Sequence, residues 1–137
     1  AATKAYVDSV ASGLDVKKSV RVATTSAGTL ENSFENGNTL DGIALVTGDR
    51  ILIKNQIDLT ENGIYTVNSS GTPTRAEDFN DNAEIDNGAF IFVSEGDHNG
   101  DRSFVLSHSD SPVNLGTTEL NFHEIYRYLS HYKFLYL

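Results

Sequence analysis

Residues 39–56 read TLDGIALVTGDRILIKNQ, and residues 61–67 read ENGIYTV. Both stretches consist of short runs rich in Val, Ile, Leu and Tyr, which are separated by Gly, Asn and Asp. Such runs favour β-strands, and the Asp-Gly and Asn-Gly pairs favour tight turns, because Asn and Asp tolerate the positive φ that Gly adopts freely. Residues 51–53 lie between Arg50 and Lys54, so we expect a buried strand there with charged ends.

The same texture extends from residue 15 to residue 125. Strands are expected at residues 16–23, 50–54, 63–67, 89–93, 103–106 and 120–125, with a further apolar stretch that contains a turn at 40–46. Helical periodicity occurs in only one segment, so the crossover helices that usually join parallel strands have no sequence to form them. The sequence therefore predicts a mainly β fold, a compact antiparallel sandwich or barrel of about seven short strands with one short N-terminal helix.

Residues 1–14 form that helical segment. The positions of Val7, Val10 and Leu14 follow the a, d, a spacing of a helical seam. A helix of about ten residues is unstable alone in water, so its apolar stripe must pack against another surface. That surface is either the core of the domain itself or identical helices in a three-stranded coiled coil, and the pattern leaves both open.

Residues 126–137 form a C-terminal tail whose composition differs from that of the β-rich domain at 15–125. The tail concentrates aromatic and aliphatic side chains, namely Tyr126, Tyr128, Leu129, Tyr132, Phe134, Leu135, Tyr136 and Leu137. An apolar patch of this kind in water requires a partner. Docking on the domain, an oligomer interface and a truncated end all fit this composition.

The composition excludes several classes of function. The chain has 137 residues, a mass of 14.9 kDa and 39% apolar residues, which fits one globular domain. Its net charge is −9, and nucleic-acid binding requires clusters of Lys and Arg, so we expect no nucleic-acid partner. Cysteine is absent, which excludes thiolate nucleophiles and zinc–thiolate sites. No apolar run has the length of a membrane span, so we expect no membrane insertion.

The sequence contains no recognisable catalytic motif. The histidines His98, His108, His123 and His131 form no His-Glu-x-x-His pattern, no serine lies in Gly-x-Ser-x-Gly, and no phosphate-binding glycine loop occurs. We therefore expect no enzyme activity, no catalytic residues, no cofactor and no metal. The alternative is a fragment of a glycan depolymerase that uses acids at residues 84–86 or 97–101, because such enzymes need only two carboxylates.

One loop has the oxygen pattern of a cation site. Asp97, Asn99 and Asp101 fall at positions 1, 3 and 5 of an EF-hand-like spacing. Arg102 and His108 occupy positions 6 and 12, where an EF-hand has Gly and Glu, so a true EF-hand is excluded. Asp and Asn also bind the local backbone in turns, and we prefer this structural interpretation, with a calcium loop as the alternative.

Several segments of the chain, taken in order, resemble a module of bacteriophage tail fibres and related virion structural proteins. The resemblance rests on residues 39–56 and 61–67, together with ATKAYVD at 2–8, GLDVKKSVR at 13–21, TRAEDF at 74–79 and GAFIFVSEG at 88–96. It covers most of residues 2–125. From the residues themselves we interpret Asp49, Arg50, Asn55 and Asn62 as conformational residues rather than ligand contacts.

The resemblance implies a non-enzymatic part of a tail fibre or spike, which serves as a scaffold or attaches to host-surface glycan. Such fibres are typically homotrimers, and this favours a subunit interface for the seam of Val7, Val10 and Leu14. It also places the chain in the virion tail or outside the cell, with assembly in the host cytoplasm. A cell-surface adhesin domain of prophage origin would have the same physical features.

Overall fold

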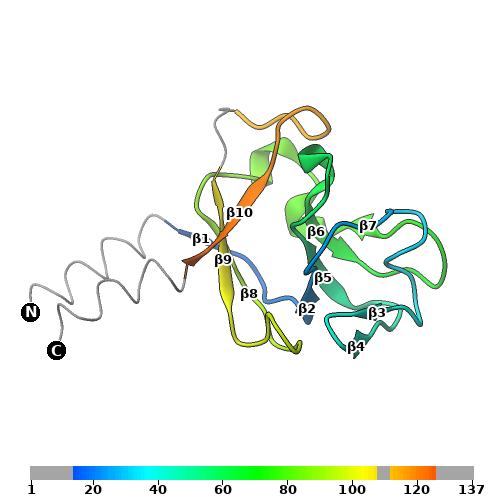
Figure 1. Ribbon diagram of the computed structural model, residues 1–137. Coiled ribbons are helices and arrows are strands. Elements are labelled where there is room, and N and C mark those ends of the chain that lie inside the picture. Colours follow the sequence, from blue (N-terminus) through cyan, green and yellow to red (C-terminus); the bar gives the residue numbers. More distant parts are fainter. Residues whose placement is uncertain (1–13, 108–111, 126–137) are drawn as a thin grey trace, which may run out of the picture.

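The computed structural model describes residues 14–107 and 112–125, and the fold is mainly β (Figure 1). The ten strands of the described part are β1 (Asp15–Val16), β2 (Val22–Ala23), β3 (Thr39–Leu40), β4 (Ile43–Ala44), β5 (Arg50–Ile53), β6 (Gly63–Thr66), β7 (Thr74–Arg75), β8 (Ala89–Phe92), β9 (Ser103–Ser107) and β10 (Asn121–Glu124). Its 3-10 helices are η1 (Leu59–Glu61), η2 (Glu77–Phe79) and η3 (Asn82–Glu84). The strands form two four-stranded sheets, ordered β1-β8-β9-β10 and β2-β5-β6-β7, and a separate β3-β4 pair.

Two strand pairs are parallel, which corrects the antiparallel arrangement expected from the sequence. β1 pairs with β8 and β2 pairs with β5 in parallel, whereas the other pairs within the sheets are antiparallel. The expectation was wrong because it required a helix for each crossover. A parallel pair needs only a connection long enough to bring the chain back to the same end of the sheet, whether or not that connection is helical. Residues 24–49 link β2 to β5, and residues 17–88 link β1 to β8, with no helix longer than the 3 residues of η1, η2 or η3.

Residues 16–23, expected as a single strand, instead pair with strands of both sheets. Val20 N donates to Phe92 O at 2.9 Å, and Arg21 N donates to Arg50 O at 2.7 Å. This segment therefore lies between β8 and β5 and joins one edge of each sheet to the other. The opposite edges are β10 and β7, which do not pair with each other in the described part of the chain, so the sheets do not close into a barrel.

Two clusters of buried side chains form the core. The first lies between the sheets and takes members from both, among them Leu52, Ile64, Ile91, Phe104 and Leu106. The second lies on the other face of β5 and β6 and comprises Val22, Phe34, Leu40, Leu45, Ile51, Ile53, Tyr65 and Val67. Because β5 is buried on both faces, its apolar run is continuous rather than alternating. The buried strand predicted at this run is confirmed.

The Asp41-Gly42 pair forms the predicted turn. It connects β3 to β4, with Leu40 paired to Ile43, and its two residues have φ values of 48° and 80°. Positive φ at both positions is typical of the type I′ turn, whose twist matches that of the flanking strands.

Some predictions concern residues that the structure does not describe. The N-terminal helix, with Val7 and Val10, and the tail at 126–137 lie outside the described residues. Leu14 is described, is half-buried and lies outside regular secondary structure directly before β1. Within the described ranges, no helix combines the length and apolar character needed to cross a bilayer.

Candidate functional site

A polar groove of about 420 Å³ lies where β5 begins. Its walls come from Lys18 before β2, Gly48 and Arg50 at the start of β5, Thr66 at the end of β6, and residues 76–78 around η2. The sequence places two basic and two acidic side chains among these lining residues. The groove therefore presents positively charged hydrogen-bond donors from Lys18 and Arg50 and negatively charged acceptors from Glu77 and Asp78.

An ion pair between Arg50 and Asp78 forms part of this groove. Arg50 Nη1 and Nη2 donate to the two carboxylate oxygens of Asp78 at 2.7 and 2.8 Å, and Nε and Nη2 donate to Lys18 O at 3.2 and 3.1 Å. Burial by itself would raise the pKa of Asp78, but the hydrogen bonds and charge of Arg50 outweigh it and lower that pKa below its ordinary value. Arg50 thus joins β5 to η2 and to the chain before β2.

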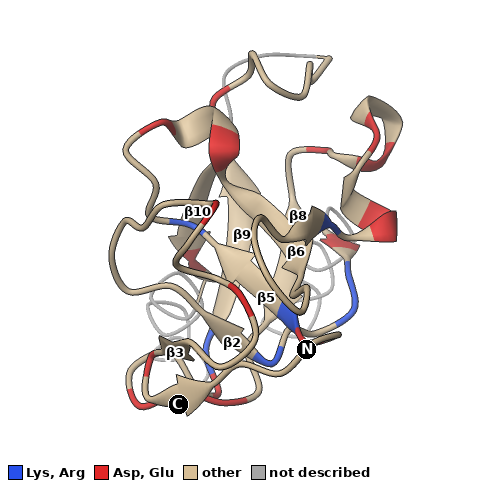
Figure 2. Cartoon of the chain, turned by 90° about the vertical axis from the view of Figure 1, so that its right-hand side faces the viewer, with Lys and Arg blue, Asp and Glu red and all other residues tan. Residues whose placement is uncertain are grey.

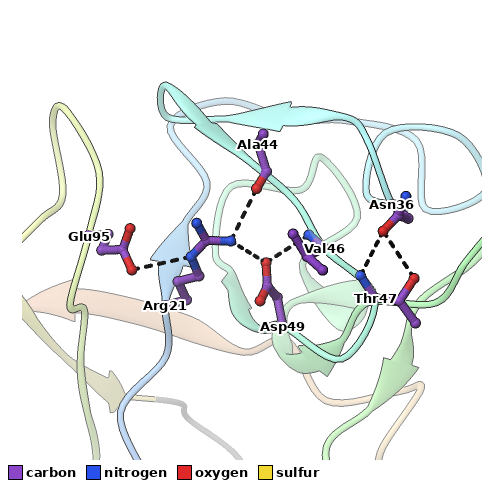
Figure 3. Close-up of polar contacts among 7 residues, drawn as sticks. All are labelled: Arg21, Asn36, Ala44, Val46, Thr47, Asp49 and Glu95. Atoms are coloured by element: carbon purple, nitrogen blue, oxygen red, sulfur yellow. Dashed lines mark hydrogen bonds and ion pairs between the residues drawn. The ribbon is translucent and has the colours of Figure 1, made fainter.

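A second network surrounds Arg21 and is drawn in Figure 3. Arg21 Nη1 donates to Asp49 Oδ2 at 2.6 Å and to Ala44 O at 3.1 Å, and Nε donates to Glu95 Oε2 at 3.2 Å. Asp49 Oδ2 also accepts from Val46 N at 2.8 Å, which shapes the turn before β5. Arg21 therefore connects three segments: β4, the start of β5 and the loop after β8.

Two aspartates pack against glycines of each other's loops. The Asp97 carboxylate lies against Gly42, the neighbour of Asp41, and the Asp41 carboxylate lies against Gly96, the neighbour of Asp97. A Cβ on Gly42 would lie 2.1 Å from Asp97 Oδ2, and a Cβ on Gly96 would lie 2.3 Å from Asp41 Oδ2. Asp41 Oδ2 also accepts from Asn99 N at 2.8 Å. The β3-β4 turn thereby holds the loop between β8 and β9, and a side chain at either glycine would displace the carboxylate that lies against it.

The structure places the three residues of the predicted cation loop in different environments. Asn99 is buried, and its Nδ2 donates to Thr24 O at 2.9 Å. Asp97 lies against Gly42, whereas Asp101 is exposed and has a positive φ of 65°. Each of the three therefore has a structural contact or a turn conformation of its own.

The acids proposed for a depolymerase are also spread out. Glu84 is half-buried in η3 and accepts from Asn80 N at 3.3 Å, whereas Asp86 is exposed before β8. Acidic residues are distributed over the loops and 3-10 helices (Figure 2). Among the residues that the structure describes, no three His, Asp or Glu side chains form a group that would hold a metal ion.

Asn62 and Asn55 make internal hydrogen bonds. Asn62 is fully buried, its Oδ1 accepts from Gln56 N at 3.0 Å, and its Nδ2 donates to Leu120 O at 2.9 Å. Asn55 Oδ1 accepts from Thr24 Oγ1 at 2.6 Å. Both side chains thus fix the loop that follows β5, in agreement with their interpretation as conformational residues.

Sequence reasoning assigned no contact to the side chains of Lys54 and Arg75. Lys54 Nζ lies 4.8 Å from the centroid of the Phe104 ring, and burial is the main reason that its pKa is lowered. Arg75 donates to Asn62 O at 3.0 Å, and its guanidinium carbon lies 5.0 Å from the centroid of the Tyr65 ring. No local pattern signals these contacts, because they depend on which strands become neighbours.

No family model, curated protein or solved structure matches this chain.

Proposed function

We propose that this chain is a non-enzymatic structural module of a bacteriophage virion, part of a homotrimeric tail fibre or spike. The main support is the role of the polar residues in the segments that resemble tail-fibre modules. Asp41 and Asn62 accept hydrogen bonds from backbone N–H groups of neighbouring loops, and Asp49 accepts one from Val46 N in its own turn. Arg50 binds a backbone carbonyl and Asp78. Side chains that bind their own backbone define a shape, which is what a structural module requires.

In this proposal the two sheets form a small sandwich that acts as a rigid scaffold in the virion tail. Ion pairs between segments far apart in the sequence, such as Arg21 with Glu95 and Arg50 with Asp78, support this role because they resist relative movement of the sheets and loops. Attachment to host-surface glycan is the alternative role of the same module, and the polar groove at β5 is the surface we would examine for it.

Sedimentation equilibrium tests the assembly part of the proposal. We expect a species of three times the chain mass of 14.9 kDa at micromolar concentrations. A monomer under those conditions would contradict the trimer. The non-enzymatic part is tested by incubation with capsular polysaccharides, for which we expect no release of reducing ends, and sustained release would establish a depolymerase instead.

A further inference from the structure

The polar groove at the start of β5 has walls that are fixed in position. Arg50 makes two hydrogen bonds to the Asp78 carboxylate and two to Lys18 O, and its side chain is only 18% exposed. Thr66 lies opposite Arg50 in the register of β5 and β6, so the two side chains share one face of the sheet. A site whose donors and acceptors are already in place loses little conformational entropy when a ligand binds. The groove is therefore preformed.

The charges that line the groove cancel. Lys18 and Arg50 contribute two positive charges and Glu77 and Asp78 two negative charges, although the whole chain has a net charge of −9. Arg50 and Asp78 neutralise each other in their ion pair. Lys18 and Glu77 are exposed, and neither forms an ion pair with another described residue. A polyanion thus finds no net positive charge in the groove and is repelled by the rest of the chain.

The size and the lining of the groove narrow the class of ligand further. Its volume of about 420 Å³ lies in the range of about 300–1,000 Å³ that is typical of small-molecule sites. Such sites are usually lined by apolar and aromatic side chains. Among the described residues that line this groove, only Ala76 has an apolar side chain, and none is aromatic. The groove therefore suits a ligand that is polar over most of its surface.

We infer that the groove binds a neutral ligand rich in hydroxyl groups, a sugar without carboxylate, sulfate or phosphate. A hydroxyl both donates and accepts hydrogen bonds, so neighbouring hydroxyls of one sugar pair with the Lys18 ammonium and the Glu77 carboxylate. The Asp78 oxygens have further lone pairs beyond those that bind Arg50. The inference rests on the attachment role in the proposed function, because it names the class of glycan that the module would hold. Since no aromatic ring is present for stacking, we expect a dissociation constant of about 1 mM.

An NMR titration of the ¹⁵N-labelled full chain tests this inference. The probes are neutral oligosaccharides built from hexoses, 6-deoxyhexoses and N-acetylhexosamines. We expect at least one of them to shift the amide resonances of Lys18, Gly48, Thr66 and Glu77, which line the groove. The sulfated form of the same oligosaccharide is the matched anionic ligand, and it should bind at least about tenfold more weakly.

Substitutions in the groove give an independent test. Lys18→Ala and Glu77→Ala each remove one exposed charged group, and each should raise the dissociation constant of the neutral sugar at least about threefold. Glu31→Ala is the matched control, because Glu31 is an exposed acid that does not line the groove. It should leave the dissociation constant unchanged. Circular dichroism should show the wild-type spectrum for all three variants.

The outcomes separate this inference from the proposed assembly. The inference would be overturned by the absence of shifts with every neutral oligosaccharide at about 10 mM, by shifts scattered over the surface, or by tighter binding of the sulfated form. Equal effects of Glu77→Ala and Glu31→Ala would overturn it as well. A homotrimer that binds no neutral sugar would contradict only the inference, whereas a monomer that binds one in the groove would contradict only the homotrimer.

Discussion

Replacing Asn62 with Ala removes two hydrogen bonds from the interior of the domain. The substitution leaves Gln56 N and Leu120 O without the partners that they have at 3.0 and 2.9 Å. Gln56 and Leu120 are 4% and 0% exposed, so water does not replace the lost bonds. A buried polar group that loses its partner costs about 1–3 kcal/mol, and two such groups predict a loss of about 2–6 kcal/mol of unfolding free energy.

Urea denaturation followed by circular dichroism measures this loss. With a dependence on urea of about 2 kcal/mol per molar, the middle of the range for a small domain, the midpoint should fall by roughly 1–3 M. Asn68→Ala is the matched control, because Asn68 Nδ2 donates to Thr72 O at 2.8 Å and to Thr74 Oγ1 at 3.0 Å, both in exposed surroundings. There we expect a loss below about 1 kcal/mol, since water satisfies the groups left behind.

A result in which Asn62→Ala and Asn68→Ala destabilise the domain equally would refute this reasoning. It would mean that the buried Asn62 does not fix the loop after β5.

Two further predictions concern contacts around the candidate site. Asp78→Asn should cost about 0.5–1 kcal/mol at pH 7, because the ion pair with Arg50 is partly exposed. The pKa of Asp78 is lowered in the folded state, so the stability that its carboxylate contributes is present above the unfolded pKa near 3.9 and is lost as the pH falls through the folded pKa. Acid titration should therefore destabilise the wild type more than Asp78→Asn. Identical dependence of unfolding free energy on pH in the two proteins would contradict this role of the ion pair. Gly96→Ala should cost more than about 2 kcal/mol in urea denaturation, because its φ is +129° and its Cβ would push the Asp41 carboxylate away from His98 N and Asn99 N, from which it accepts hydrogen bonds. Gly37→Ala, with a φ of +93° and no atom near its Cβ position, should cost only about 1–2 kcal/mol, and equal losses for the two variants would show that the contact with Asp41 is unimportant.

The parts of the fold that depend on local chemistry were predictable from the sequence. The apolar run at 51–53 indicated a buried strand, and the Asp41-Gly42 pair indicated a tight turn, because each signal is contained within a few residues. The pairing of residues 15–23 with both β8 and β5 was not predictable in this way. It depends on contacts between segments that are distant in the sequence. The lack of further helical periodicity in the sequence led to the wrong prediction that all strand pairs are antiparallel.

The residues of the candidate site likewise divide into those that a local sequence signal predicts and those whose contacts depend on the tertiary structure. Asn62 could be interpreted as conformational because Asn-Gly is a turn former, but its buried partner Leu120 lies in a different part of the chain. Arg21 selects Asp49 and Glu95 from nineteen acidic residues, and only the tertiary structure decides which carboxylates come within reach.

The central claim is that polar side chains such as those of Asn62 and Asp41 fix the conformation of the loops around them. Native-state hydrogen exchange measured by NMR tests this claim most directly. The decisive amides are those of Gln56 and Asn99, which are buried residues and donate to the side chains of Asn62 and Asp41 instead of to a neighbouring strand. We predict that these two amides exchange as slowly as the amides of β5, through global unfolding. Rapid exchange of both while β5 stays protected would contradict the claim.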